Sequence, residues 1–108
     1  MSLVRGTLDV LVLKSLSWAP MHAFEVATWL EGRSAGRLSV EDAALMQALH
    51  RLEARGLLGS DWGVTATARR ARYYHITDDG RAHLHAETAR LTDYVDALTT
   101  VLAARRAD

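Results

Sequence analysis

The chain has 108 residues, and its 13 basic and 13 acidic side chains give a formal net charge of zero at pH 7. Nucleic-acid-binding proteins usually carry a basic excess, so any such function has to rest on local clusters of charge. Hydrophobic residues make up 49% and charged residues 24% of the sequence, with a single proline, which excludes a disordered chain. The lack of cysteine excludes disulfides and thiolate metal sites, and is typical of a reducing compartment.

The length suits one small structural unit, whose core is marginal unless a partner subunit completes it. The apolar run at residues 3–18 contains Arg5, Asp9 and Lys14. It is too short and too charged to span a membrane, and it lacks the layout of a signal peptide. We therefore expect a cytoplasmic protein with no membrane partner.

Two helices are predicted first. One begins at Gly6 or Thr7 and is apolar nearly all round, so it is either central or shared between subunits; its main stripe consists of Leu8, Leu11, Val12 and Leu16. The other follows Pro20 and is expected to stop at Gly32. Its apolar positions are Ala23, Val26, Ala27 and Leu30.

A third helix is predicted in "VEDAALMQALHRLEARGLL", residues 40–58. Ser39 or Val40 marks its start and Gly56 its end. Its inward stripe consists of Leu45, Ala48, Leu49 and Leu52. Its outward positions are Asp42, Ala43, Met46, Gln47, His50 and Arg51.

A β-hairpin and a long helix complete the chain. "LLGSDWG" and "RYYHIT" are typical of two short strands, and the polar, basic "VTATARRA" between them forms an exposed tip. Thr77 is a good N-cap for a helix running from about Asp78 to about Ala104.

The last helix carries an almost continuous heptad seam. Leu84, Leu91 and Leu98 are spaced by seven residues, as are Thr88, Val95 and Leu102. Such a seam needs another helix to cover it, which predicts a homodimer. We expect the dimerisation residues to be Leu8, Leu11, Leu84, Leu91, Val95, Leu98 and Leu102. The alternative is that the seam folds back on the chain's own first helix.

The order helix, helix, helix, hairpin, long helix predicts a mainly α fold with a small β-hairpin, namely a winged helix-turn-helix with a long C-terminal dimerisation helix. Residues 1–77 would form the DNA-binding part and residues 78–108 the dimerisation helix. In such proteins the third helix enters the major groove and the hairpin tip touches the flanking backbone.

Several stretches together resemble the PadR-type transcriptional regulators, in particular their short subgroup with one C-terminal helix. "GTLD", "ALHRLEARGL", "RRARYYHIT" and "DDGR" occur in the order typical of that family. The resemblance implies a cytoplasmic, dimeric, DNA-binding repressor acting on an inverted-repeat operator. Phe24, Ala44 and Met46 stand where relatives commonly carry hydroxyl groups, which often contact phosphates.

The expected DNA-binding residues lie in the third helix and the hairpin, and are Ser39, Ala44, Met46, Gln47, His50, Arg51, Thr67, Arg69, Arg70 and Arg72. Gln47 can pair with adenine, whereas the arginines suit phosphates or the minor groove. The alternative for the hairpin is a merely solvated charge cluster, and for the third helix an ordinary exposed face.

Other functions find little support. His83 and His85 point to different sides of a helix, and no catalytic constellation is present, so we expect no enzyme, no metal and no cofactor. Trp18, Trp29 and Trp62 could line a pocket for a small-molecule inducer at the dimer interface. The alternative is that they are core residues, which we expect for Trp62 in particular. The competing function, motivated by the lost hydroxyls and the zero net charge, is a winged-helix protein-interaction module that has lost DNA binding.

Overall fold

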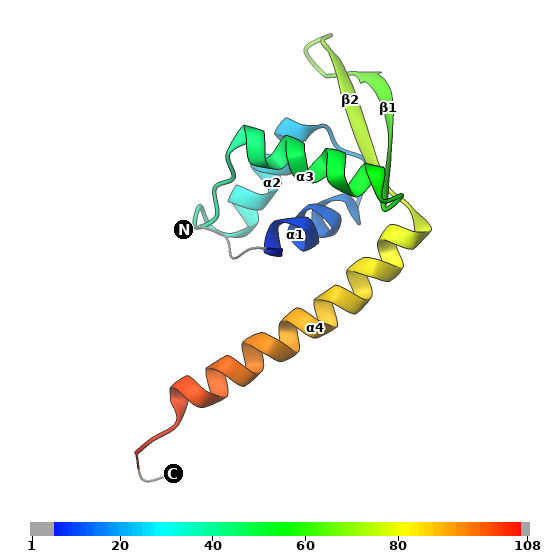
Figure 1. Cartoon of the computed structure of the whole chain (residues 1–108). Coiled ribbons are helices and arrows are strands. Elements are labelled where there is room, and N and C mark those ends of the chain that lie inside the picture. The colour runs from blue at the N-terminus through cyan, green and yellow to red at the C-terminus, as the bar shows by residue number, and fades with distance from the viewer. Residues whose placement is uncertain (1–5, 107–108) are drawn as a thin grey trace.

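The computed structural model describes residues 6–106, so the predicted limits at residues 1–5 and 107–108 lie outside it. The elements are α1 (Thr7–Leu16), α2 (Ala23–Arg33), α3 (Asp42–Ala54), β1 (Leu58–Val64), β2 (Arg70–Ile76) and α4 (Asp78–Ala103). Figure 1 shows three short helices in one cluster, the hairpin rising from one end of α3, and α4 running out on the other side of α1. The predicted mainly α, winged-helix fold is confirmed.

Helix ends follow local chemistry. The His22 ring accepts from the amide of Glu25 while the Glu25 carboxylate accepts from the amide of His22, a reciprocal cap that starts α2. We expected α2 to stop at Gly32, which is wrong. The helix runs to Arg33, and the chain turns at Ala35, which has a left-handed φ of 54°.

The start and end of α3 differ in how well the sequence marks them. Glu41 is its N-cap, so the expected start at Ser39 or Val40 lies one or two residues too early. Gly56 ends it as predicted. Its φ is +75°, and the amides of Gly56 and Leu57 donate to the carbonyls of Glu53 and Leu52. This paired arrangement is the helix-terminating motif that favours glycine.

The core lies where α1, α2, α3 and the hairpin base meet. The predicted inward residues of α3 are all buried, together with residues from each neighbouring element: Val12, Leu13, Leu16, Val26, Leu30, Leu45, Ala48, Leu49, Leu52, Leu57, Leu58, Tyr74 and Ile76. Helix α1 packs against α2, α3, α4 and β2, as its all-round apolar character predicts.

The two strands pair antiparallel, with Leu58 opposite Ile76 and Trp62 opposite Arg72. Met21 exchanges two backbone hydrogen bonds with Tyr74 on the outer edge of β2, which ties the start of α2 to the hairpin. The base of the wing is therefore anchored along the edge of β2.

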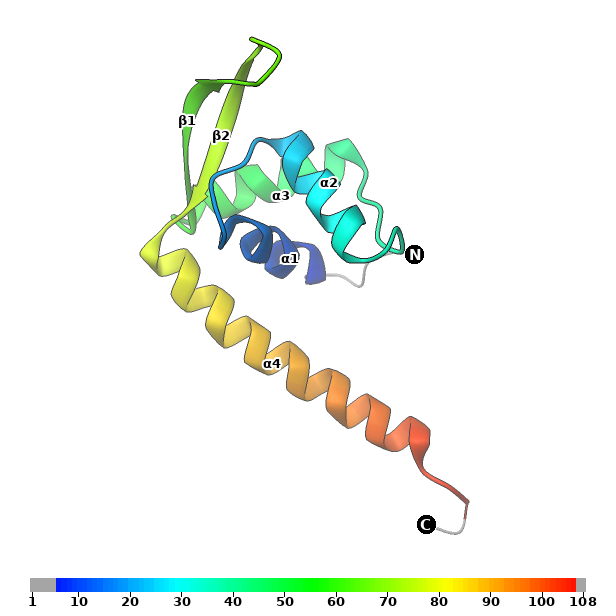
Figure 2. The same ribbon diagram turned by 180° about the vertical axis from the view of Figure 1, so that it is seen from behind.

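Helix α4 lies beside α1 along its first half and then leaves the cluster. Thr77 caps it by accepting from the Gly80 amide, and Leu84 packs against the core. Beyond this first part the helix projects away from the other elements, and Figure 2 shows the same projection from behind. The longest dimension of the molecule is 62 Å. Within residues 6–106, no helix is long and apolar enough to cross a membrane.

Candidate nucleic-acid interface

The outer face of α3 is only partly polar. Gln47 and His50 are exposed, as predicted, and Ala43 joins them one turn before Gln47. Met46, which we expected to point outward, is half-buried and packs against the core because it neighbours the buried stripe. Ala44 is also half-buried. Few side chains on the outer face of α3 are therefore fully exposed.

Arg51 is tied to the first helix. Its Nη2 lies 2.5 Å from one carboxylate oxygen of Asp9 in α1, and its Nε lies 3.3 Å from the other. The hydrogen bond to Asp9 raises the pKa of Arg51, and the charge of Asp9 acts in the same direction. This bidentate pair links α1 to α3, so the Arg51 charge is matched within the chain rather than left for a phosphate.

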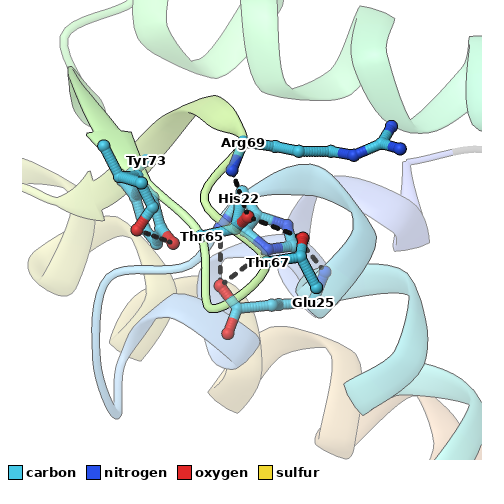
Figure 3. Close-up of polar contacts among 7 residues, drawn as sticks. His22, Glu25, Thr65, Thr67, Arg69 and Tyr73 are labelled. Carbon is cyan, nitrogen blue, oxygen red and sulfur yellow. Dashed lines mark hydrogen bonds and ion pairs between the residues drawn. The ribbon is translucent and has the colours of Figure 1, made fainter.

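The tip of the wing is an ordered turn, drawn in Figure 3 together with the cap of α2. The Thr65 amide donates to the Arg69 carbonyl at 2.8 Å, and the Thr65 hydroxyl accepts from the Arg69 amide. Thr67 shares a hydrogen bond with Thr65 at 3.1 Å, and Ala68 closes the turn with a φ of 60°. The Arg69 side chain extends away from these contacts.

The arginines of β2 meet an exposed tryptophan. Trp62 lies opposite Arg72 and diagonal to Arg70, with their guanidinium carbons 5.4 Å and 4.3 Å from the ring centroid. Trp62 is 57% exposed, so the expectation that it belongs to the core is wrong. The hairpin extends beyond the core, and its core-side face carries this stacked cluster instead.

A polar network connects the wing to α3. Glu53 accepts a hydrogen bond from the Ser60 hydroxyl, which itself accepts from Nε of Arg72 at 2.8 Å. Nη2 of Arg72 lies 3.7 Å from the Glu53 carboxylate. Sequence reasoning missed Glu53 and Ser60 because they become neighbours only through the strand register. Within residues 6–106, no acidic side chain pairs with Arg69 or Arg70.

The first turn of α3 is acidic. Glu41 and Asp42 are both exposed there, and so is Ser39 in the preceding loop. Phe24 of α2, 76% exposed, lies next to this end of α3. At this end of α3 the charge is therefore negative, whereas the tip and second strand of the wing carry three exposed arginines.

The predicted dimerisation residues fall into two groups. Leu8 and Leu11 of α1 and Leu84 of α4 already pack against the core of their own chain. Val95, Leu98 and Leu102 are 51%, 45% and 84% exposed on the projecting part of α4. Between α1 and α4 runs a mainly apolar groove of about 620 Å³, which includes Leu11, Lys14, Arg81 and Leu91.

Other candidate sites are weak. Within the described part of the chain, no three His, Asp or Glu side chains gather where they could hold a metal ion. Trp18 is 67% exposed, with the Lys14 ammonium 5.1 Å from its ring, and Trp29 is half-buried beside Arg33.

A family model decides the relationship of the chain. The model of the transcriptional regulator PadR-like family matches residues 12–86, from the middle of α1 into α4. The chain belongs to the PadR-like family. This family comprises transcriptional regulators, not enzymes. Comparison with curated proteins finds no match.

Solved structures of transcriptional regulators share the fold. A transcriptional regulator from Clostridium thermocellum is 21% identical with a TM-score of 0.80, over 89% of this chain and 93% of that one. A PadR family regulator from Eggerthella lenta is 29% identical with a TM-score of 0.79, over 94% and 86%. Bacillus subtilis PadR in complex with operator DNA is 17% identical with a TM-score of 0.68, over 76% and 47%.

Proposed function

We propose that the protein is a homodimeric DNA-binding repressor of transcription that binds an inverted-repeat operator through α3 and the wing. The observation that carries this proposal is the wing itself. Arg69 and Arg70 are exposed on a hairpin braced against α3, and within residues 6–106 no carboxylate neutralises them. Two guanidinium groups without an acidic partner among the described residues lie on a hairpin next to a helix that carries an exposed glutamine. This combination suits a duplex, since guanidinium groups bind phosphates and a glutamine can bind base edges.

Helix α3 and the wing would make different contacts with the duplex. Gln47 would read a base edge, with Ala44 and Met46 beside it, while His50 and Ser39 reach the backbone. Arg69 and Arg70, with Thr67 at the tip, would hold phosphates or enter the minor groove. Arg72 and Arg51 are already paired with Glu53 and Asp9, so their main role would be to hold the wing and α3 in place.

The second copy would pair through residues 78–108. Val95, Leu98 and Leu102 form the exposed part of the heptad seam, and the groove between α1 and α4 lies beside its first part. An apolar helix face of this kind needs a cover of equal length. A small-molecule inducer at this interface would favour one dimer geometry and so change the distance between the two DNA-binding parts. We place this regulator in the cytoplasm.

Salt dependence tests the proposal. The affinity of the purified protein for the DNA upstream of its own gene should fall steeply as salt rises. The double substitution Arg69→Ala and Arg70→Ala should reduce the slope of log affinity against log salt by about two, because two phosphate contacts are lost. Fluorescence anisotropy with labelled duplexes measures both values, and Arg33→Ala, on the far end of α2, is the matched control.

A protein-interaction module is the second candidate. The acidic first turn of α3 favours it, because Glu41 and Asp42 repel phosphates at the end of the helix that would enter the groove. The formal net charge of zero points the same way. A protein that binds no duplex at low salt, its own upstream DNA included, would support this function and exclude the repressor.

A further inference from the structure

A shallow hollow separates the N-terminal ends of α2 and α3. Its volume is about 290 Å³, and its lining is Ala23, Phe24, Asp42, Leu45 and Met46. The Phe24 ring forms one wall and is 76% exposed, whereas Leu45 is buried. Four of the five lining residues are apolar, so this hollow suits a small apolar group better than a phosphate oxygen.

The charges around the hollow also disfavour phosphate. Asp42 belongs to its lining and Glu41 precedes it, both exposed in the first turn of α3. A carboxylate repels a phosphate but accepts hydrogen bonds from the amino groups of bases. This end of α3 therefore fits the neutral edges of base pairs rather than the backbone.

Gln47 completes the surface. It is exposed, follows Met46 directly and lies one turn after the exposed Ala43. A glutamine amide can form two hydrogen bonds with the major-groove edge of adenine, and the thymine paired with that adenine presents a methyl group on the same edge. Alanine and phenylalanine side chains are among those that contact this methyl.

We propose that the hollow between Phe24 and Met46 receives the C5-methyl group of a thymine, in or next to an A·T pair read by Gln47. This inference rests on the proposed DNA binding and specifies which group of the duplex this end of α3 contacts. Helix α3 therefore favours operator sites with A·T pairs, and the wing makes the backbone contacts.

Uracil substitution tests this inference. A duplex selected by the purified protein from a random pool is synthesised again with deoxyuridine in place of each thymine in turn. The change removes one methyl group and leaves the phosphates and hydrogen-bonding groups intact. At one or two positions in each half-site, affinity should fall about fourfold, the effect of burying one methyl group.

Protein variants locate the methyl group. Phe24→Ala should bind the thymine and uracil duplexes equally at those positions, because the wall of the hollow is gone. Phe24 is largely exposed, so this variant keeps the core intact. Trp18→Ala removes an equally exposed aromatic ring outside the hollow and should keep the fourfold difference.

The outcomes separate this inference from the function it rests on. Equal affinity of the wild-type protein for thymine and uracil duplexes at every position would overturn the inference and leave DNA binding intact. A difference that persists unchanged in Phe24→Ala would also overturn it. Failure to bind any duplex at low salt would overturn both, and would direct the search for an occupant of the hollow to a protein partner.

Discussion

Gly80 lies where the first turn of α4 meets the base of the hairpin. A Cβ atom at this position would overlap the carbonyl oxygen of Leu57 and lie 2.7 Å from Cγ1 of Ile76. The carbonyl belongs to the backbone and cannot rotate away, so only glycine allows the helix to approach this closely. This contact fixes where α4 leaves the cluster.

Gly80→Ala should therefore lower the free energy of unfolding by about 1–3 kcal/mol, the usual effect of overpacking. Gly32→Ala is the matched control, because its Cβ would meet no atom within 4 Å inside α2. That variant should gain about 0.5–1 kcal/mol from helix propensity. Urea unfolding followed by circular dichroism measures both, and equal stability of the two variants would contradict the close contact.

Tyr74 carries a buried hydroxyl without a hydrogen-bond partner among the described residues. Burial raises the pKa of Tyr74, and the nearby charge of Glu53 adds to the shift. A raised pKa means that the folded state holds this proton more tightly than the unfolded chain does. The associated stability is complete below about pH 10 and is lost as pH rises above it.

Tyr74→Phe should leave the free energy of unfolding at pH 7 unchanged or raise it by about 1 kcal/mol, because no hydrogen bond is lost. It should also reduce the loss of stability above about pH 10. Urea unfolding at the two pH values checks both statements. Tyr94→Phe, at an exposed position of α4, should behave as wild type at both.

At the scale of elements, a charged contact holds the wing against α3, and an aromatic contact joins its two strands. Glu53 fixes Arg72 through Ser60, and Trp62 stacks on Arg72 and Arg70. These contacts orient the guanidinium groups before DNA arrives, which reduces the ordering needed on binding. Trp62 is therefore a positioning residue for the wing.

Trp62→Ala should weaken binding to the selected duplex by about threefold to tenfold, since two exposed cation–π contacts are lost. The dependence of affinity on salt should not change, because Arg69, Arg70 and Arg72 keep their charges. Trp62→Phe should restore most of the affinity, and Val64→Ala, at an exposed apolar position of the same strand, should have no effect. Anisotropy titrations at several salt concentrations measure this, and wild-type affinity for Trp62→Ala would exclude the positioning role.

The hairpin also shows how far sequence reasoning reaches. Both strands were predicted, the second from its alternating aromatic and β-branched side chains, and Thr77 and Gly56 marked the adjoining helix ends correctly. Trp62 was assigned to the core because large aromatic side chains are usually buried, and the sequence does not say where the core beneath the hairpin ends. The pairs Arg51–Asp9 and Arg72–Glu53 join residues from different elements, and spacing along the chain carries no signal for them.

At the scale of the whole molecule, α4 has two parts with different surroundings. The sequence left open whether the seam meets another copy or the chain's own first helix, because a heptad seam has the same spacing whichever helix covers it. The 10 residues of α1 span about 15 Å, whereas the 26 residues of α4 span about 39 Å. Helix α1 is too short to cover the whole seam, so the exposure of its second part follows from length alone.

Leu98→Glu should convert the proposed dimer to a monomer by raising its dissociation constant about a hundredfold or more, because burying an unpaired carboxylate costs several kcal/mol. Thr100→Glu places the same charge outside the seam and should leave the dimer intact. Sedimentation equilibrium at micromolar concentration measures the assembly. A wild-type protein that is already monomeric there would remove the dimer from the proposed function.

The close contact at Gly80 has a consequence for the geometry of such an assembly. Each residue turns an α-helix by about 100° and advances it by about 1.5 Å. One residue inserted between Leu84 and Val95 would rotate the exposed seam by about 100° around the axis of α4. The contact at Gly80 would keep the first turn of α4 in place against the hairpin. In a dimer, the angle between the two wings around the axis of α4 would thus depend on the number of residues between Gly80 and the exposed seam. It would not depend on the identity of those residues.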